Sequence, residues 1–476
     1  MSDVVLNNKQ QYAFDLVTQG KNVFITGSAG VGKSLVISHI RDWCRDNNKK
    51  IMVTATTGVA AANVNGTTFH GWAGIGLGKS KKEKMSEQLL EHELRKRAYY
   101  LKRNEAAYSR YVDTDVLVID EVSMLDFQFI SKVNSIAKLL RKSSLPFGGI
   151  QLVFTGDFFQ LGPVQKERKT TKFVFEDYIW SELMNECVHL TEVYRQKSND
   201  FIAMLHKIRT GDIDDEIVKR IQSTSTNKLT NDLGIVPTVL FCKNVDVDVM
   251  NARGIARLEE KEYKFPAVDK YLNDTCKELY SGSFTYQSSL TLKVGAQVML
   301  IKNLDVEKKL VNGSRGVITD IVDDDPVECP GGKVTVKFMD GTEHTIKPDA
   351  QKFTDDPSHK EKAHGFVDPT VLASRIQFPL KLAYALTVHK AQGLSIDYLH
   401  VDLKGAFSPG QAYVALSRAT SFDTLRVTNF SKKCVITSEQ VKEFYKKLDN
   451  GGNVTAKRTK TDQIQTYFIK KIKTET

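Results

Sequence analysis

The segment NVFITGSAGVGKSLVISHIRDWC, residues 22–44, carries the clearest chemical pattern in the chain. It contains the spacing G-x-x-x-x-G-K-S between an apolar run that predicts a strand and a segment that predicts a helix. Glycines let backbone N–H groups curve around a phosphate, and the amino end of a helix adds a partial positive charge. We therefore expect a nucleotide-phosphate site formed by Gly27, Ser28, Ala29, Gly30, Val31, Gly32, Lys33 and Ser34.

Two of these residues are expected to act on the phosphates directly. Lys33 is expected to reach the β- and γ-phosphates, and the Ser34 hydroxyl to bind Mg²⁺. A second apolar run, VLVID, ends in Asp120 and is followed by Glu121. An acidic pair at the end of a buried strand is costly unless a cation or substrate lies there. We expect Asp120 to hold Mg²⁺ and Glu121 to orient or deprotonate the attacking water, although the first turn of a helix is also acidic in many proteins.

A third apolar run, IQLVFT at residues 150–155, is followed by GDFFQLGPV. If this run is another strand of the same sheet, Asp157 and Gln160 emerge beside the phosphates. An uncharged amide can hydrogen-bond a γ-phosphate or its attacking water and lose that partner after hydrolysis. Gln160 is therefore a candidate phosphate sensor; the alternative is a glutamine in a surface turn.

The composition indicates a globular chain of several domains. Its 476 residues suggest two to four domains, and the hydrophobic fraction of 41% is ordinary. There is no apolar run long enough to span a membrane and no pattern of a secretory signal at the beginning. The six cysteines are scattered without a C-x-x-C pair, which argues against a zinc site or a disulfide framework. We expect a soluble protein of a reducing, intracellular compartment.

The net charge of +10 favours a polyanionic partner. Residues 79–110 hold ten Lys and Arg against five Glu, with Tyr99, Tyr100 and Tyr108 among them. This pattern predicts either a solvated helical face or an arm that faces nucleic acid, because aromatic side chains among cations suit single strands.

Seven motifs occur in the order found in superfamily-one helicases: GSAGVGKS, TATTGVAAANVNGTTFHGWAGIGLG, VLVIDEVSMLD, FGGIQLVFTGDFFQLGPV, LTEVYRQ, LTVHKAQGLS and QAYVALSRA. The sequence resembles the Pif (petite integration frequency) family of DNA helicases, superfamily 1B, related to RecD and Dda. The segment LDFQFISKVNSIAKLLRKSSLPFGG resembles the one that marks Pif proteins. One departure is Gly162, which stands where the family usually has proline and should loosen that turn.

The resemblance implies an α/β fold with two RecA-like P-loop domains, each on a parallel sheet. We expect the first domain at 1–195, with an inserted basic helical or loop arm at 71–110. The second is expected at 196–430. Within it, alternating residues and N-G, G-G and D-G turns predict a small SH3-like β-barrel at 291–370. Residues 431–476 are expected to form a basic C-terminal tail.

The resemblance also implies roles for further residues. It assigns Gln10 to the adenine edge, Tyr194 to stacking on the base and Arg195 to the γ-phosphate. Arg418 is implied to be an arginine finger from the second domain, which stabilises transition-state charge. A motif that couples the nucleotide to the strand contains Gln392 and Gly393. Four residues are implied to contact the nucleic acid, two in each domain: Phe69, His70, His389 and Lys390.

These observations together predict an ATP- and Mg²⁺-dependent DNA helicase of replication, repair or recombination. ATP-driven closure of the two RecA-like domains would step it along single-stranded DNA and unwind forked duplex DNA. The 5′-to-3′ direction comes from the resemblance alone. We expect it to act as a monomer, away from membranes. The alternatives are a motor with RNA as its substrate and an ATP-dependent clamp that binds nucleic acid without unwinding.

The end of the chain holds a separate short pattern. Ile464, Tyr467 and Phe468 fall at i, i+3 and i+4, on one face of a helical turn. The arrangement resembles the peptide by which replication proteins bind a sliding clamp, although Thr461 stands in place of the usual Gln. The alternative is an amphipathic turn docked on the protein's own surface.

Overall fold

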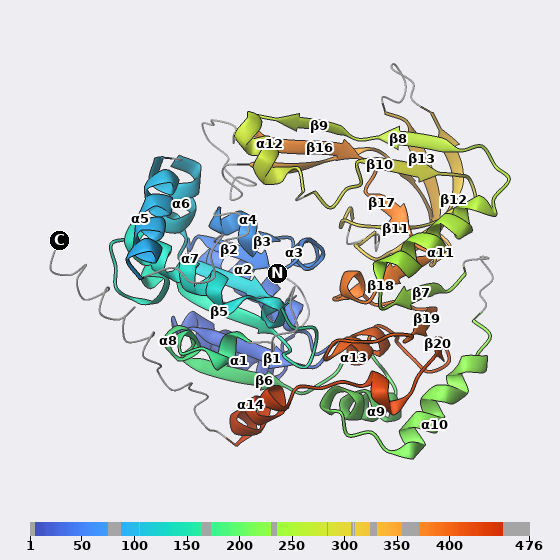
Figure 1. The fold of residues 1–476 in the computed structure, drawn as a ribbon, viewed down its shortest axis with the longest axis horizontal. Helices are drawn as coiled ribbons and strands as arrows, with labels where there is room; N and C mark the ends of the chain where they lie inside the picture. Colours follow the sequence, from blue (N-terminus) through green and yellow to red (C-terminus); the bar gives the residue numbers. More distant parts are fainter. Residues whose placement is uncertain are drawn as a thin grey trace. The chain divides into compact units, whose positions relative to one another are not determined.

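The computed structural model describes residues 5–74, 87–103, 105–163, 173–229, 236–282, 284–305, 308, 310–323, 331–354 and 371–450. These residues form two compact units (Figure 1). Unit 1 takes the described residues within 1–57, 66–193 and 438–476, and unit 2 takes those within 58–65 and 194–437. The chain thus passes between the units close to the expected boundary at residue 195. It also does so around 58–65 and at 437–438, which the sequence did not indicate.

Unit 1 is built on a six-stranded parallel sheet with the order β3-β2-β4-β5-β1-β6. Parallel strands that are covered on both faces need apolar or small residues at nearly every position. The sequence meets this condition, since all five residues of β1 and of β4 are buried. The strands are β1 (Val23–Gly27), β2 (Ile51–Ala55), β3 (Thr67–Thr68), β4 (Val116–Asp120), β5 (Gln151–Gly156) and β6 (Glu186–Leu190).

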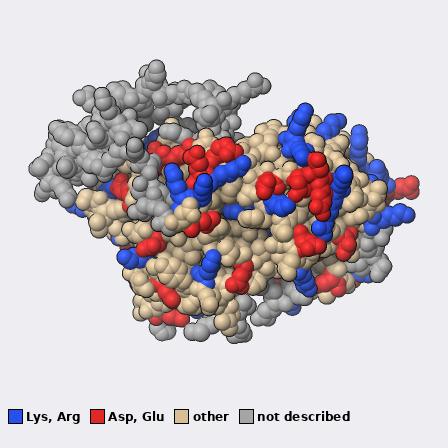
Figure 2. Space-filling model, turned by 90° about the horizontal axis from the view of Figure 1, so that it is seen from below, with Lys and Arg blue, Asp and Glu red and all other residues tan. Residues whose placement is uncertain are grey.

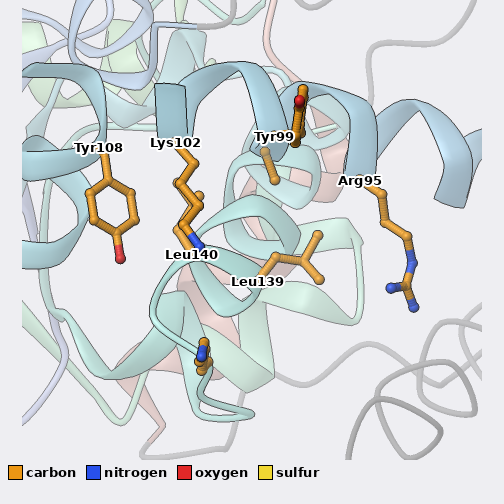
Figure 3. Close-up of a pocket in the computed structure, with 8 residues that line it drawn as sticks. Arg95, Tyr99, Lys102, Tyr108, Leu139 and Leu140 are labelled. Carbon is orange, nitrogen blue, oxygen red and sulfur yellow. The ribbon is translucent and has the colours of Figure 1, made fainter. Parts of the chain in front are cut away.

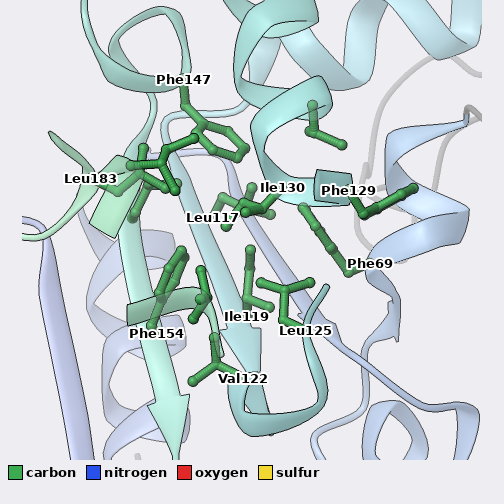
Figure 4. Close-up of a cluster of buried hydrophobic side chains, with 14 of the residues drawn as sticks. Phe69, Leu117, Ile119, Val122, Leu125, Phe129, Ile130, Phe147, Phe154 and Leu183 are labelled. Carbon is green, nitrogen blue, oxygen red and sulfur yellow. The ribbon is translucent and has the colours of Figure 1, made fainter. Parts of the chain in front are cut away.

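A large apolar cluster joins this sheet to its helices (Figure 4). Leu117 and Ile119 of β4 and Phe154 of β5 belong to it together with Ile130 of α7. The helices of unit 1 are α1 (Asn8–Thr18), α2 (Lys33–Asp46), α4 (Phe69–Ala73), α5 (Glu87–Arg103), α6 (Glu105–Asp113), α7 (Phe127–Leu140), α8 (Ile179–Leu183) and α14 (Glu439–Asp449). Short 3₁₀ helices cover Val122–Met124, Pro146–Gly149 and Val174–Glu176.

The segment that marks Pif proteins forms α7. Its helix begins after Asp126, whose side chain accepts a hydrogen bond from the backbone N–H of Gln128 at 2.8 Å. Its buried apolar residues recur at helical spacing, as expected for a helix with one face on a core: Phe129, Ile130, Val133, Ile136, Ala137 and Leu140.

The expected basic arm is helical where the structure describes it. Ala98 and Leu101 of α5 and Tyr111 of α6 are buried in the same cluster as α7. The Tyr111 hydroxyl donates a hydrogen bond to the carbonyl oxygen of Ala73 at 2.8 Å. The arm is therefore docked on unit 1, while the Tyr99 side chain on its outer surface is 53% exposed.

Helix α14 is a correction to the expected tail. Val441, Phe444 and Tyr445 are buried, and the Phe444 ring lies 5.9 Å from the ring of Trp180 in unit 1. The prediction that 431–476 is a tail is therefore wrong for Glu439–Asp449. Its apolar residues recur at i, i+3 and i+4, which is a core-facing helical pattern.

Unit 2 contains a four-stranded parallel sheet with the order β18-β7-β19-β20. Its strands are β7 (Thr238–Phe241), β18 (Ala385–Thr387), β19 (Leu399–Asp402) and β20 (Leu425–Thr428). The helices of this unit are α3 (Gly58–Asn63), α9 (Asn199–Thr210), α10 (Asp215–Ser223), α11 (Asn244–Ala256), α12 (Asp274–Tyr280) and α13 (Gln411–Leu416). Short 3₁₀ helices cover Thr224–Thr226, His389–Ala391 and Lys432–Cys434.

The segment between β7 and β18 is antiparallel. A five-stranded sheet has the order β14-β13-β12-β11-β17, with β11 (Gln297–Leu300), β12 (Arg315–Val322), β13 (Lys333–Phe338), β14 (Glu343–Ile346) and β17 (Leu380–Leu382). Two smaller sheets accompany it and contain β8 (Tyr263–Pro266), β9 (Val268–Tyr271), β10 (Ser289–Leu292), β15 (Asp349–Thr354) and β16 (Val371–Gln377). The insertion expected at 291–370 therefore begins earlier and ends later, because strands from both flanks complete its sheets.

Within the described ranges, the chain has no helix that is both long and apolar enough to cross a membrane. The five cysteines described are all free, and no cluster of three or more metal-binding side chains is found among the described residues.

We predict that Phe444→Ala destabilises unit 1 by about 3–5 kcal/mol, because it removes a buried aromatic ring. Trp43, Trp72 and Trp180 all lie in unit 1, so urea unfolding followed by tryptophan fluorescence reports on this unit alone. Lys446→Ala, on the exposed side of the same helix, is the control and should change stability by less than about 0.5 kcal/mol. Equal stability of the two variants would contradict the packing of α14 on unit 1.

Candidate nucleotide and nucleic-acid sites

The loop Gly27–Ser34 follows β1 and leads into α2. Gly32 immediately precedes α2 with φ of 81°, a left-handed conformation that favours glycine. At Gly27 a Cβ atom would lie 2.4 Å from the carbonyl oxygen of Leu190, so a larger residue does not fit. The two glycines give the loop its curvature at the amino end of a helix of 14 residues, the geometry of a phosphate site.

The Lys33 ammonium lies within the curve of this loop. Its Nζ donates hydrogen bonds to the carbonyl oxygens of Gly27 at 2.8 Å and Ser28 at 3.0 Å. These contacts hold the positive charge where the loop would place a phosphate.

The acidic pair lies at the end of β4, two strands from β1 in the sheet. Asp120 Oδ1 accepts hydrogen bonds from the Glu121 backbone N–H at 2.9 Å and from the Thr155 hydroxyl of β5. Burial raises the pKa of the Asp120 carboxyl, and the hydrogen bonds from Thr155 and Glu121 and the charge of Lys33 oppose this rise. Glu121 has φ of 54°, a conformation that is strained for a residue with a side chain. The strained backbone turns the chain sharply at the carboxyl end of the strand.

Gln160 lies in a tight turn after β5. Its backbone N–H donates a hydrogen bond to the Asp157 carbonyl oxygen at 2.9 Å. The side chain is only 3% exposed, yet its Oε1 atom has no hydrogen-bond partner among the described residues. A buried acceptor without a partner costs free energy, so Gln160 has the features of a group held ready for a ligand.

Gln10 contacts the phosphate loop through its side chain. Its Nε2 donates a hydrogen bond to the Val31 carbonyl oxygen at 3.0 Å, while its Oε1 accepts one from the Asn7 backbone N–H at 3.0 Å. The residue therefore links the beginning of α1 to the loop. An amide has two N–H donors and two acceptor lone pairs, so each end retains capacity for a base.

The other predicted nucleotide residues lie in unit 2. The Arg195 guanidinium donates to the carbonyl oxygens of Ser417 at 3.2 Å and Gly393 at 3.3 Å. Arg418 is 1% exposed and donates to the carbonyl oxygens of Val414 at 3.0 Å and Leu394 at 3.2 Å. Both guanidinium groups therefore contact the backbone at residues 393–394 and at residues 414–417 of unit 2.

Two further residues of this set differ in exposure. Gln392, next to Gly393 in the sequence, is 5% exposed, whereas the Tyr194 ring is 57% exposed. An exposed aromatic ring can stack on a base, which is the role that the resemblance assigns to Tyr194.

The predicted nucleic-acid contacts in unit 1 need correction. Phe69 is completely buried and stacks on Trp72 with ring centroids 5.9 Å apart. The prediction that Phe69 contacts a strand is therefore wrong; its ring belongs to the core. His70 is half-buried and stacks on Phe129 at 4.0 Å, and burial lowers its pKa. At neutral pH it can offer a hydrogen bond rather than a charge.

The predicted pair in unit 2 lies in the 3₁₀ helix His389–Ala391. Burial lowers the pKa of His389, while Lys390 is exposed. Sequence reasoning missed a third residue, Lys381 of β17. Burial, and then the positive charge of Lys390, lower the pKa of Lys381 to about 8. A lysine inside the apolar run FPLKLAYAL was the available signal.

A small pocket of about 240 Å³ lies between α5, α6 and α7 (Figure 3). Leu139 and Leu140 of α7 contribute apolar surface, and Tyr99 and Tyr108 contribute aromatic rings. Among the described residues, three cations and no acidic side chain line it: Arg95, Lys102 and Lys142. Figure 2 shows that acidic and basic side chains both occur on the visible face, whereas the charged side chains described in the pocket lining are all basic.

The expected clamp-binding residues Ile464, Tyr467 and Phe468 lie outside the described residues.

Comparison with known proteins identifies the family. Residues 5–219 match the PIF1-like helicase family, and residues 282–321 match the 2B domain of DNA helicase Pif1. The chain is 37% identical over 451 residues to the ATP-dependent DNA helicase PIF1 of Xenopus laevis, covering 93% of this chain and 64% of that protein. It therefore spans less than two thirds of that relative.

Solved structures give the same result over more of their length. The crystal structure of Pif1 helicase from Candida albicans superposes with a TM-score of 0.77 at 39% identity, covering 94% of this chain and all of that chain. Pif1 helicase from Bacteroides in complex with ADP-AlF3 and ssDNA has a TM-score of 0.67 at 26% identity, covering 96% and 100%. The chain belongs to the Pif1-like helicase family.

Proposed function

We propose that this protein is an ATP-dependent DNA helicase. One observation carries the proposal: the phosphate loop, the acidic pair and Gln160 follow three adjacent strands, β1, β4 and β5, at one edge of the unit 1 sheet. Relatives are named ATP-dependent DNA helicases, and the Bacteroides relative binds ADP-AlF3 and ssDNA together. This chain therefore combines a hydrolytic site with membership of a DNA-motor family.

The unit 1 residues divide the steps of ATP hydrolysis among them. The loop amides and Lys33 hold the β- and γ-phosphates. The Ser34 hydroxyl and the Asp120 carboxylate are hard oxygen ligands of the kind Mg²⁺ prefers, and they would hold this ion. When bound, Mg²⁺ neutralises charge on the phosphates. Glu121 orients and deprotonates the attacking water, and Gln160 senses the γ-phosphate.

Arg195 and Arg418 are proposed to stabilise the charge of the transferring phosphate. Both guanidinium groups already hydrogen-bond carbonyl oxygens of their own unit. This role therefore requires them to exchange those hydrogen bonds for phosphate oxygens during turnover, when the charge-assisted bonds are stronger.

The function is tested by ATP-dependent unwinding of two DNA duplexes, one with a 5′ and one with a 3′ single-stranded tail. We expect the 5′-tailed duplex alone to open, as the family resemblance implies. Lys33→Ala should abolish both unwinding and ATP hydrolysis, because the phosphates lose their cation. Unwinding by this variant would contradict the assigned site.

Matched DNA and RNA forks separate the remaining alternatives. Opening of the RNA fork alone would favour an RNA motor. Strand-stimulated hydrolysis without unwinding of either fork would favour an ATP-dependent clamp.

We propose that Lys381, His389 and Lys390 form part of the DNA contact in unit 2. Among the described residues, the Lys381 ammonium has no carboxylate or hydrogen-bond partner, and its pKa is lowered partly by Lys390. Two neighbouring cations repel each other, and a phosphate between them relieves this repulsion.

The affinity for single-stranded DNA should fall as the pH rises from 7 to 9. Lys381 of the free protein is charged below its pKa of about 8 and neutral above it, so DNA binding above pH 8 must first restore a proton. The salt dependence of binding should become shallower by about one ion over this range. Fluorescence anisotropy measures both effects. Lys381→Arg keeps its charge and should remove this pH dependence; an unchanged fall would contradict the role of Lys381.

We also propose that the pocket between α5, α6 and α7 binds a nucleic-acid strand. Its cations suit phosphates, and its tyrosines suit bases. This is the second of the two interpretations of the basic arm.

Lys102→Glu should weaken DNA binding and reduce the slope of log affinity against log salt by about one or more. Lys96→Glu changes the same charge on the same helix outside the pocket and is the control. Salt titrations of both variants test the proposal. It fails if the two substitutions weaken binding equally.

We propose further that one monomer suffices for unwinding and that the C-terminal segment engages a sliding clamp. Unwinding rates across protein concentrations test the first point. Recovery of Tyr467→Ala/Phe468→Ala on an immobilised clamp, compared with the unsubstituted protein, tests the second.

A further inference from the structure

The C-terminal helix α14 reaches the turn that carries Gln160. The Tyr445 hydroxyl lies 3.2 Å from Asp157 Oδ1 and accepts a hydrogen bond from the Phe158 backbone N–H at 3.1 Å. Its ring stacks on Phe159, with centroids 4.9 Å apart and planes 18° apart. One side chain thus contacts all three residues between β5 and Gln160.

The same hydroxyl also contacts the strand before the phosphate loop. Tyr445 Oη lies 2.6 Å from the Thr26 hydroxyl oxygen, and Thr26 donates to the Gly156 carbonyl oxygen at 2.9 Å. A tyrosine hydroxyl has one proton and two lone pairs. Because the Thr26 proton goes to Gly156, the single Tyr445 proton lies between two acceptors, the Thr26 hydroxyl oxygen at 2.6 Å and Asp157 Oδ1 at 3.2 Å. The hydroxyl then ties the end of β1 to the turn after β5.

This network is buried, so water does not compete with it. Tyr445 is 4% exposed, and Thr26 and Asp157 are completely buried. At the end of α14, Asp449 lies 2.8 Å from His189 Nδ1 of β6 and holds the helix at a second point. The helix is anchored at both points to strands of the unit 1 sheet.

The Asp157 carboxylate and the Phe158 backbone N–H are both engaged in hydrogen bonds that hold this turn. Asp157 also accepts from the Phe159 backbone N–H at 3.2 Å, and its carbonyl oxygen accepts from the Gln160 backbone N–H. Gln160 Oε1 has no partner among the described residues. Helix α14 therefore holds the turn, while the Gln160 Oε1 atom keeps its capacity to accept a hydrogen bond.

We propose that Tyr445 is a positioning residue for ATP hydrolysis: its hydroxyl holds the Asp157–Phe159 turn so that the Gln160 amide meets the γ-phosphate. The inference rests on the proposed function. Tyr445 acts through Gln160 and does not touch the nucleotide. A segment beyond the helicase motifs thereby becomes part of the hydrolytic machinery.

The test is Tyr445→Phe, which keeps the ring and its packing and removes the hydroxyl. We expect single-strand-stimulated kcat to fall about tenfold with KM for ATP changed less than about twofold, because misplacement affects the transition state more than binding. Tyr111→Phe is the matched control. It also removes a buried hydroxyl of unit 1, one that bonds Ala73 in the docked arm. Its kcat should equal that of the unsubstituted protein.

A double-substitution cycle separates positioning from a general loss of stability. In a Gln160→Ala background, Tyr445→Phe should lower single-turnover hydrolysis no further, because the group that it positions is absent. An additional tenfold loss in that background would overturn the proposal, as would unchanged kcat in Tyr445→Phe alone.

The outcomes distinguish this inference from the function on which it rests. If the unsubstituted protein shows no strand-stimulated hydrolysis, the proposed function fails and the inference fails with it. If the unsubstituted protein is active and Gln160→Ala is impaired while Tyr445→Phe is not, the function stands and the inference alone is overturned. Tryptophan fluorescence confirms that each variant is folded.

Discussion

The adjacency of β4, β5 and β1 in one parallel sheet is the constraint on which the chemistry of unit 1 depends. Parallel neighbours end at the same edge, so residues that are far apart in the sequence emerge together. The Thr155 hydroxyl of β5 bonds Asp120 of β4, and the Thr26 hydroxyl of β1 bonds Gly156 of β5. These side chains link the strand ends and hold the phosphate loop, the acidic pair and the sensor turn in one register.

Burial strengthens the hydrogen bonds between these strand ends and also shifts the pKa values of the ionisable side chains. Burial raises the pKa of the Asp120 carboxyl, while hydrogen bonds from Thr155 and Glu121 and the charge of Lys33 favour its charged form. Burial acts in the opposite sense on His70 and His389, whose pKa values it lowers. In the DNA contact that we propose for unit 2, the charge therefore comes from lysines rather than from His389, and Lys381 loses part of its charge near pH 8.

Under our proposals, the hydrolytic site extends beyond the recognised motifs to helix α14. The chain leaves unit 1 after residue 193 and returns at residue 438 to pack on the back of the sensor turn. Phe444 of this helix fills the core, and Tyr445 supplies a buried hydroxyl to the turn. Two adjacent residues of one helix thus serve stability and, in our proposal, catalytic geometry.

The sequence by itself determined the two-domain α/β class and the positions of the glycine-rich loop, the acidic pair and Gln160 after their strands. Each depends on local spacing or on a short strand with a polar end, and such patterns survive in the linear order of residues. It predicted the second-unit insertion with incorrect ends, since strands from both flanks pair only in the folded chain.

Tertiary structure alone decided which predicted side chains are accessible. Phe69 resembles a base-stacking residue in sequence, but its neighbours Trp72 and Phe129 enclose it in the core. The proposed role of Lys381 depends on Lys390, which lies on another element. The proposed role of Tyr445 depends on Asp157, which is distant in the sequence. Burial and hydrogen bonding depend on all the elements that surround a side chain, and local spacing does not contain that information.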